Sequence, residues 1–119
     1  MRTCTSDKCL PNQILPLGSQ IESANGKYKL NMLTTGNLVI KCNNGTIWSA
    51  NTANKGNVDG MYFQRNGHVV LRSNDGLIIW QTEKKGVQFV MQNDGNLVLY
   101  KTGNEAVWDS RTVKKCSGR

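Results

Sequence analysis

Long hydrophobic runs, proline and histidine are scarce in this sequence. No apolar segment reaches the roughly 20 residues of a membrane-spanning helix, and the opening MRTCTSDKC lacks the apolar stretch of a secretory signal. The single histidine, His68, has no Cys/His cluster around it, and the eight acidic residues are scattered. The sequence therefore predicts no membrane insertion, no metal, no cofactor and no catalytic activity.

Glycine and asparagine are abundant instead. Twelve glycines against two prolines favour tight turns over long helices, and few stretches place apolar residues at helical spacing. With 119 residues and 38% hydrophobic content, the chain suits one domain with one core. We expect a single, mostly β domain over residues 1–119.

The net charge is +7, and basic proteins attract polyanions even without specific contacts. Most of the basic residues stand singly. The exceptions are Lys84 and Lys85, and the C-terminal Arg111, Lys114, Lys115 and Arg119. We interpret this dispersed charge as a solvated surface and expect no specific nucleic acid partner; a basic binding stripe is the alternative.

The four cysteines, Cys4, Cys9, Cys42 and Cys116, lack metal-ligand spacing and indicate disulfides. Four cysteines allow three pairings, and the sequence alone does not choose among them. We favour Cys4 with Cys9 and Cys42 with Cys116. Disulfides imply an oxidising compartment, so we expect a secreted, extracellular protein, exported by a leader since removed or by an unconventional route.

One unit of about 30 residues occurs three times along the chain. The segments LTTGNLVIK (33–41), QRNGHVVLR (64–72) and QNDGNLVLY (92–100) each place a glycine before an aliphatic run. Period-two alternation and turn residues predict a small antiparallel sheet in each unit. The expected bounds are about 27–52, 58–84 and 86–112, with an N-terminal strand over about 12–22 and a flexible basic tail over 113–119.

Each repeat also carries one tryptophan: Trp48, Trp80 or Trp108. A sheet of about four short strands cannot bury its apolar face alone, so we expect three sheets to pack faces inward around a pseudo-threefold axis. The tryptophans would meet near that axis in the core; exposed sugar-stacking platforms are the alternative. The residues after them, Ser49, Gln81 and Asp109, are candidate partners for the indole N–H groups.

These repeats resemble the bulb-type, or monocot mannose-binding, lectins, whose pattern Gln-x-Asp-x-Asn-x-Val-x-Tyr occurs three times. The third unit matches all five positions, with Gln92, Asp94, Asn96, Val98 and Tyr100. The resemblance covers roughly residues 12–112. It implies an all-β fold, a β-prism of three four-stranded antiparallel sheets with pseudo-threefold symmetry.

The resemblance also implies a shallow mannose pocket in the third unit. Asp94 and Asn96 would bond the axial 2-hydroxyl, Gln92 the 3-hydroxyl and Tyr100 the 4-hydroxyl, while Val98 would contact the carbon face of the sugar. Period-two spacing would aim all five side chains to one side of the sheet. Because each hydroxyl bond nets only about 0.5 to 1.5 kcal/mol, we expect roughly millimolar binding of a single mannose.

The other two units depart from the pattern. The five positions hold Gln64, Asn66, His68, Val70 and Arg72 in the second unit, and Leu33, Thr35, Asn37, Val39 and Lys41 in the first. Both units lose the acid and the tyrosine, so they are degenerate candidates for mannose. Because Lys41 and Arg72 replace the tyrosine, one interpretation is a drift towards anionic glycans. The plainer interpretation is that lost sites became soluble surface.

The sequence thus predicts a non-catalytic lectin for mannose-containing glycans, with one intact site in the third repeat. A basic defence protein and a protein-binding scaffold with vestigial sugar sites are the alternatives. In relatives the last strand often crosses to the sheet of a partner, and EAVWDSRTVKK could do so here. We therefore expect a homodimer.

Overall fold

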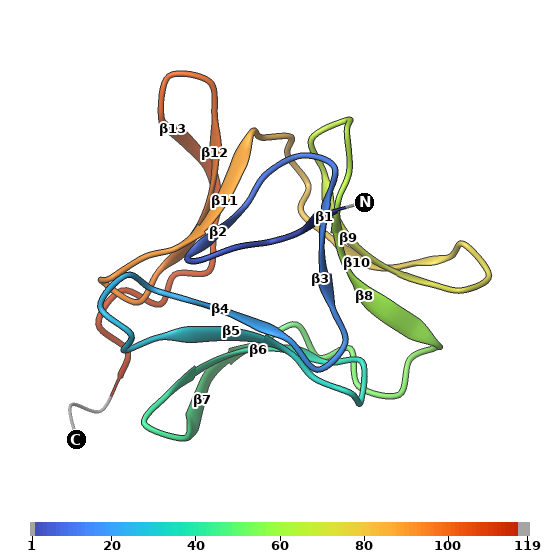
Figure 1. The fold of residues 1–119 in the computed structure, drawn as a ribbon, viewed down its shortest axis with the longest axis horizontal. Coiled ribbons are helices and arrows are strands. Elements are labelled where there is room, and N and C mark those ends of the chain that lie inside the picture. Colours follow the sequence, from blue (N-terminus) through green and yellow to red (C-terminus); the bar gives the residue numbers. More distant parts are fainter. Residues whose placement is uncertain (1, 117–119) are drawn as a thin grey trace.

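The structure is a computed structural model that describes residues 2–116 and folds them into thirteen strands in three β-sheets. The sheets form the three sides of a triangular prism (Figure 1). The predicted all-β prism is confirmed. Two of the sheets have the expected four strands, and the other has a fifth.

Each repeat contributes three consecutive strands to one sheet. The first-unit sheet has the order β4-β5-β6-β7, with strands Gln20–Glu22, Lys29–Met32, Leu38–Cys42 and Gly45–Ser49. The second-unit sheet has the order β1-β3-β8-β9-β10, with strands Arg2–Thr3, Gln13–Pro16, Val58–Phe63, Val69–Ser73 and Ile78–Gln81. The third-unit sheet has the order β13-β12-β11-β2, with strands Glu105–Asp109, Leu97–Lys101, Gln88–Met91 and Lys8–Cys9.

The first hairpin of every unit closes with the same turn. In the third unit Gln92 N donates to Asn96 O and Gly95 N donates to Gln92 O, both at 3.0 Å, and equivalent bonds close the turns at Gly36 and Gly67. The three glycines have φ values of 90°, 97° and 92°. Residues with a Cβ rarely adopt this conformation, which explains the glycine at the fourth place of each repeat.

The N-terminal segment differs from the single strand expected over about 12–22. Gly18, with φ of 81°, turns the chain between β3 and β4, so that β3 pairs with β8 of the second-unit sheet and β4 pairs with β5 of the first-unit sheet. Upstream, β2 pairs with β11 of the third-unit sheet, and β1 lies parallel to β3. The N-terminal segment therefore supplies an edge strand to all three sheets and ties them together.

Alternate residues of the middle strands build a shared core. Leu38 and Ile40 of β6, and Leu97 and Leu99 of β12, are fully buried in it. The rings of the three tryptophans meet edge to face, with centroids 5.7 to 5.9 Å apart, as favoured for aromatic rings. Their side chains are half-buried and pack against the buried core instead of forming its centre.

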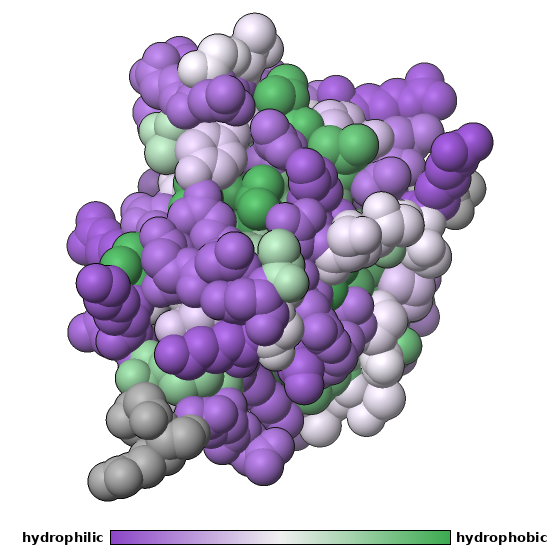
Figure 2. All heavy atoms as spheres, turned by 60° about the vertical axis from the view of Figure 1, so that its left-hand side comes forward, coloured by the Kyte–Doolittle hydropathy of each residue, from purple (hydrophilic) through white to green (hydrophobic). Residues whose placement is uncertain are grey.

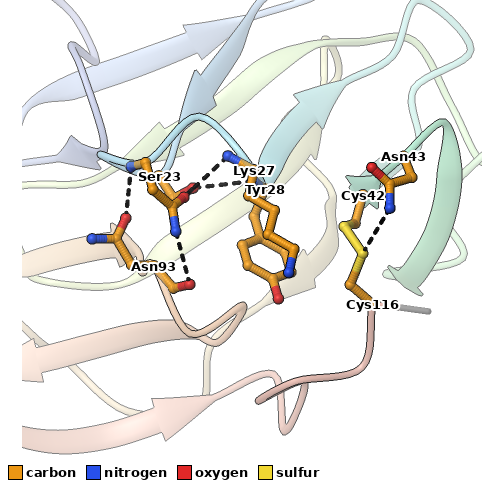
Figure 3. Close-up of a disulfide and its surroundings, with 8 residues drawn as sticks. Ser23, Lys27, Tyr28, Cys42, Asn43, Asn93 and Cys116 are labelled. Carbon is orange, nitrogen blue, oxygen red and sulfur yellow. Dashed lines mark hydrogen bonds between the residues drawn. A yellow bond between two sulfur atoms is a disulfide. The ribbon is translucent and has the colours of Figure 1, made fainter. Parts of the chain in front are cut away.

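Two disulfides join Cys4 to Cys9 and Cys42 to Cys116, which is the pairing favoured from the sequence. The second fastens the C-terminal segment to the end of β6 (Figure 3). Lys114 N also donates to Asp94 O at 2.8 Å, so residues 114–116 are held against two units. The remainder of the tail expected to be flexible, residues 117–119, lies outside the described residues, as does residue 1.

β13 belongs to the segment EAVWDSRTVKK, which was expected to cross to a partner, and the homodimer stays a prediction. β13 pairs with β12 of the same chain, and β2 occupies the opposite edge of that sheet. Over residues 2–116 the fold offers no helix of the length and apolarity that crossing a bilayer requires.

Candidate functional site

The five positions of the third unit do not all lie along one strand. Gln92, Asp94 and Asn96 belong to the turn between β11 and β12, whereas Val98 and Tyr100 point outward from β12 itself. The turn at Gly95 brings the loop residues next to the strand. The expectation that period-two spacing along a sheet aims all five side chains to one side is wrong for Gln92, Asp94 and Asn96, because the alternation of polar residues continues through a turn.

Three of these side chains nevertheless form one hydrogen-bonded cluster. The Tyr100 hydroxyl donates to Gln92 Oε1, and Gln92 Nε2 donates to Asp94 Oδ1 at 3.2 Å and to Oδ2 at 3.3 Å. Asp94 is exposed, and Gln92 and Tyr100 are half-buried. The side of the molecule on which β11, β12 and β13 lie is mostly hydrophilic (Figure 2). The cluster therefore presents a carboxylate, an amide and a phenol to solvent.

Asn96 faces inward and holds the turn against the chain that follows β13. Its side-chain oxygen accepts bonds from Ser110 Oγ at 3.1 Å and from Thr112 N at 3.3 Å, and the residue is only 8% exposed. Its amide nitrogen donates to Asp109 Oδ2 at 2.9 Å. The carbonyl of Asn96 is thus fully occupied, while one N–H of its NH₂ group is left to donate.

Asp109 belongs to this face and has a different role from the one its sequence position suggested. It was expected to accept from an indole N–H, but its carboxylate accepts from Asn96, and Ser49 makes the equivalent bond with Asn37 in the first unit. Asp109 is the cross-strand partner of Val98, which places both on the outer face. The sequence feature that could have indicated this role is that a polar residue directly follows the tryptophan in each repeat, here Asp109 after Trp108.

The apolar part of the third-unit face is small. Val98 is only 3% exposed. Its cross-strand partner on β11, Val90, is half-buried, and Val90 in turn pairs with Lys8 of β2. A ligand on this face would meet one or two valine side chains, with a lysine on the far side of them.

The second unit uses the same turn with different side chains. His68 Nδ1 lies 2.9 Å from Thr82 O and His68 N donates to Asn66 Oδ1 at 3.1 Å, so the turn is closed as in the third unit. Gln64 begins this turn and is half-buried, and Val70 is 1% exposed on the outer side of β9. The polar positions again lie in the turn and beside the strand.

Arg72, at the place of Tyr100, stacks on an aromatic ring. Its guanidinium carbon lies 4.6 Å from the centre of the Tyr62 ring, and the Tyr62 hydroxyl donates to Asp59 Oδ1 at 2.9 Å. Burial raises the pKa of Tyr62, and so do the hydrogen bond to Asp59 and the negative charge of the Asp59 carboxylate. The positive charge of Arg72 partly opposes this increase. The charge of Arg72 is therefore engaged within the protein.

The first unit has lost the polar cluster. Leu33 and Thr35 replace the glutamine and the acid, while Asn37 keeps the inward role of Asn96 by accepting from Thr52 N at 2.9 Å. Lys41 points outward from β6 beside Val39, which is 3% exposed. Over the part of the chain that the structure describes, no three His, Cys, Asp or Glu side chains gather as a metal site would require.

Comparisons with solved structures identify the family. The chain has a TM-score of 0.83 and 25% identity with a lectin from Marasmius oreades, covering 96% of this chain and 98% of that one. A monomeric monocot mannose-binding lectin from Gastrodia elata has a TM-score of 0.81 and 28% identity with the chain, covering 91% of this chain and 99% of that one. The mannose-specific bulb lectin of Scilla campanulata has a TM-score of 0.71 and 30% identity, covering 91% of this chain and 99% of that one. The chain belongs to the bulb-type mannose-binding lectin family, with its β-prism fold.

The curated relatives that the chain matches are much longer than the chain. The chain spans 12% of the length of one of them and 30% of the length of another. The second is mannose-specific lectin 2 from Colocasia esculenta, which is 32% identical over 80 residues, or 64% of this chain. No protein-family model matches the sequence.

Proposed function

We propose that the chain binds mannose-containing glycans without catalysis, through the outer face of the third unit. The observation that carries this proposal is the cluster of Tyr100, Gln92 and Asp94, whose polar groups are bonded to one another and open to solvent. Membership of a family of mannose-binding lectins supports the choice of sugar.

The cluster suits a ligand with neighbouring hydroxyl groups. The Asp94 carboxylate accepts hydrogen bonds, Gln92 both donates and accepts, and the Tyr100 oxygen can accept from a sugar while donating to Gln92. Because these side chains already hold one another in place, fewer rotamers are lost when a sugar replaces water. Asn96 adds one amide donor, and half-buried Val90 supplies most of the apolar contact, because Val98 is only 3% exposed.

The binding of one mannose should be weak. Each hydroxyl bond exchanges a bond to water for a bond to protein and nets about 0.5 to 1.5 kcal/mol, which is consistent with dissociation constants near the millimolar range. The small valine surface adds little to this. Strong attachment to a glycan surface would need several sites engaged together, which can raise apparent affinity by about 10² to 10⁴.

A glycosidase is the alternative function, because such enzymes use a pair of carboxyl groups and Asn96 donates hydrogen bonds to both Asp94 and Asp109. Both carboxylates are exposed to water. A retaining or inverting glycosidase needs one carboxyl that stays protonated, which usually requires an apolar, desolvated pocket. The wet surroundings of both acids therefore favour binding over bond cleavage.

We also infer that the protein acts outside the cell. Both pairs of cysteines form disulfides, and such bonds persist mainly in oxidising compartments. Thiol labelling of the protein purified from its natural source, without reductant, tests this inference. Absence of labelling before reduction is expected, whereas four reactive thiols in the native protein would contradict it.

The sugar proposal is tested by calorimetric titration with methyl mannoside, with galactose as the control sugar. Asp94→Ala should weaken mannoside binding by about tenfold or more. Because Asp94 Oδ1 also accepts from Asn96 N at 2.9 Å, Asp94→Asn is a second variant that removes the charge but keeps an acceptor for the turn. The matched control is Asn66→Ala, which removes the equivalent turn acceptor from the second unit. Unchanged affinity in both Asp94 variants would show that the third unit is not the site.

A further inference from the structure

Three lysines gather on the outer face of the first-unit sheet. Lys29 of β5 and Lys41 of β6 are direct cross-strand partners, and Lys27 precedes β5. They line a hollow of about 370 Å³. The remaining residues that line it are Gln20, Gly26, Asn31, Asn43 and Asn44. The lining therefore contains cations and amides but no acid.

The positive charges of this hollow are only partly balanced from within the protein, because no ion pair involves its three lysines among residues 2–116. Like charges directly opposite each other on a sheet are destabilising, and Lys29 and Lys41 are both half-buried. The ion pair found among residues 2–116 joins Lys101 Nζ to Glu105 Oε1 at 3.6 Å, far from this face. An anion held between the two lysines would remove their repulsion.

One carboxylate lies near this face. Glu22 of β4 is the cross-strand partner of Lys29, and its Oε2 accepts from Gln20 Nε2 at 3.3 Å. Glu22 is exposed and does not line the hollow. It leaves the site with a net positive charge, because one acid stands beside three lysines.

The rim of the hollow is held by the second disulfide. Asn43 directly follows Cys42, and Asn43 Nδ2 lies 3.4 Å from Cys116 Sγ (Figure 3). On the other side Lys27 Nζ lies 5.6 Å from the centre of the Tyr28 ring, which favours an extended lysine side chain over that ring. The hollow is thus bordered by side chains with fixed neighbours.

The first and second units differ in this respect, although Lys41 and Arg72 occupy the same place in the repeat. Arg72 stacks on Tyr62, and Asp59 lines the same hollow as Arg72, so a carboxylate already faces that cation. Lys41 has a second lysine opposite it instead. Arg72 and Lys41 therefore have different charged neighbours, although they occupy the same position in the repeat.

We propose that the first-unit hollow binds an anionic group carried on a sugar, such as a phosphate, sulfate or carboxylate. Lys29 and Lys41 would share the anion, and the amides of Asn31 and Asn44 would bond the sugar hydroxyls. The outer face of β6 corresponds to the face of β12 that the proposed mannose site uses, so the choice of a sugar beside Lys41 rests on that proposed function. The hollow shares no residue with the third-unit cluster, so the two sites can be tested separately.

The test uses mannose 6-phosphate and NMR of the ¹⁵N-labelled protein, with methyl mannoside as the neutral counterpart. We expect mannose 6-phosphate to shift the amide signals of Lys29, Lys41 and Asn43, whereas methyl mannoside leaves them unmoved. Lys41→Gln should weaken this binding by about tenfold, and Lys29→Gln by a similar factor. Neither variant should unfold the protein, because each removes a repulsion between the two lysines.

The matched control is Lys84→Gln, which removes the same charge from an exposed lysine after β10. An equal loss of affinity in Lys84→Gln would mean that only net charge attracts the ligand, and would overturn the proposal. Absence of any shift at Lys29 and Lys41 would overturn it as well. Asp94→Ala should leave these shifts intact, so failure of the mannose site and failure of this site give different results.

Discussion

The side-chain nitrogen of Asn96 lies 2.9 Å from Asp109 Oδ2, and that of Asn37 lies 3.0 Å from Ser49 Oγ at the equivalent place of the first unit. In both units the asparagine oxygen accepts from the backbone of a later threonine. The asparagine of the repeat therefore fastens its turn to the segment after the tryptophan. This role is kept in a unit whose polar cluster has been lost.

The first prediction separates this structural role from sugar binding. Asn96→Ala and Asn37→Ala each leave buried donors without partners, so each should lower the free energy of unfolding by about 1 to 3 kcal/mol. Only Asn96→Ala should also weaken the binding of methyl mannoside. Urea denaturation and mannoside titration of both variants measure the two effects. Equal loss of mannoside binding in both variants would place the sugar contact elsewhere.

The repeats allowed the prism to be predicted, because period-two alternation and the regular glycines specify hairpins that cannot bury their faces singly. The edge strands could not be predicted in this way. β2 contains only Lys8 and Cys9, and its pairing with β11 depends on where the folded sheet leaves an open edge. Such a short strand has no periodicity of its own, so its place is decided by tertiary contacts.

For the candidate site of the third unit, the sequence predicted that its residues lie together but not how the chain is folded there. The pattern located Gln92, Asp94 and Tyr100 correctly as one cluster, but the positive φ of Gly95 turns the chain where the alternation suggested a continuous strand. The different surroundings of Arg72 and Lys41 were also hidden, because they depend on side chains of neighbouring strands. Cross-strand neighbours follow from register, which the repeat pattern does not specify.

The second prediction concerns the glycine of the third-unit turn. A Cβ on Gly95 would lie 2.7 Å from the Tyr28 ring and 3.0 Å from Thr112 O, and its φ is 92°. Gly95→Ala should therefore combine backbone strain with a steric clash and cost about 2 to 4 kcal/mol of stability. The matched control is Gly103→Ala, with φ of 86° and open space around the added methyl group, which should cost only about 1 kcal/mol. Similar losses in chemical denaturation would show that the close approach of Tyr28 does not matter.

The third prediction compares the two disulfides. The bond from Cys42 to Cys116 spans 74 residues, whereas the bond from Cys4 to Cys9 spans 5. A longer closed loop restricts the unfolded chain more, by about 4 kcal/mol against about 2 kcal/mol on the chain-entropy estimate. The double variant Cys42→Ala/Cys116→Ala should therefore lower the unfolding free energy more than Cys4→Ala/Cys9→Ala. A larger loss in the second variant would mean that native contacts of the N-terminal segment outweigh loop length.

The last prediction concerns the titration of Tyr62 at high pH. Because burial and Asp59 raise the pKa of Tyr62, the folded protein holds the phenol proton more tightly than the unfolded chain does. The resulting stabilisation is complete below the ordinary tyrosine pKa of about 10 and is lost as the pH rises through the higher folded value. Asp59→Asn removes both the acceptor charge and its repulsion of the phenolate, so the pKa of Tyr62 should fall.

Arg72→Gln should shift the pKa of Tyr62 in the opposite direction, because the guanidinium over the ring stabilises the phenolate. NMR titration of the Tyr62 ring carbons between about pH 9 and 12 measures both shifts, with Tyr62→Phe to assign the signals. The Tyr62 pKa should be lowest in Asp59→Asn, intermediate in the parent protein and highest in Arg72→Gln. If Arg72→Gln left the Tyr62 pKa unchanged or lowered it, the cation would not stabilise the phenolate, and Arg72 would be free to meet an anionic ligand in the way proposed for Lys41.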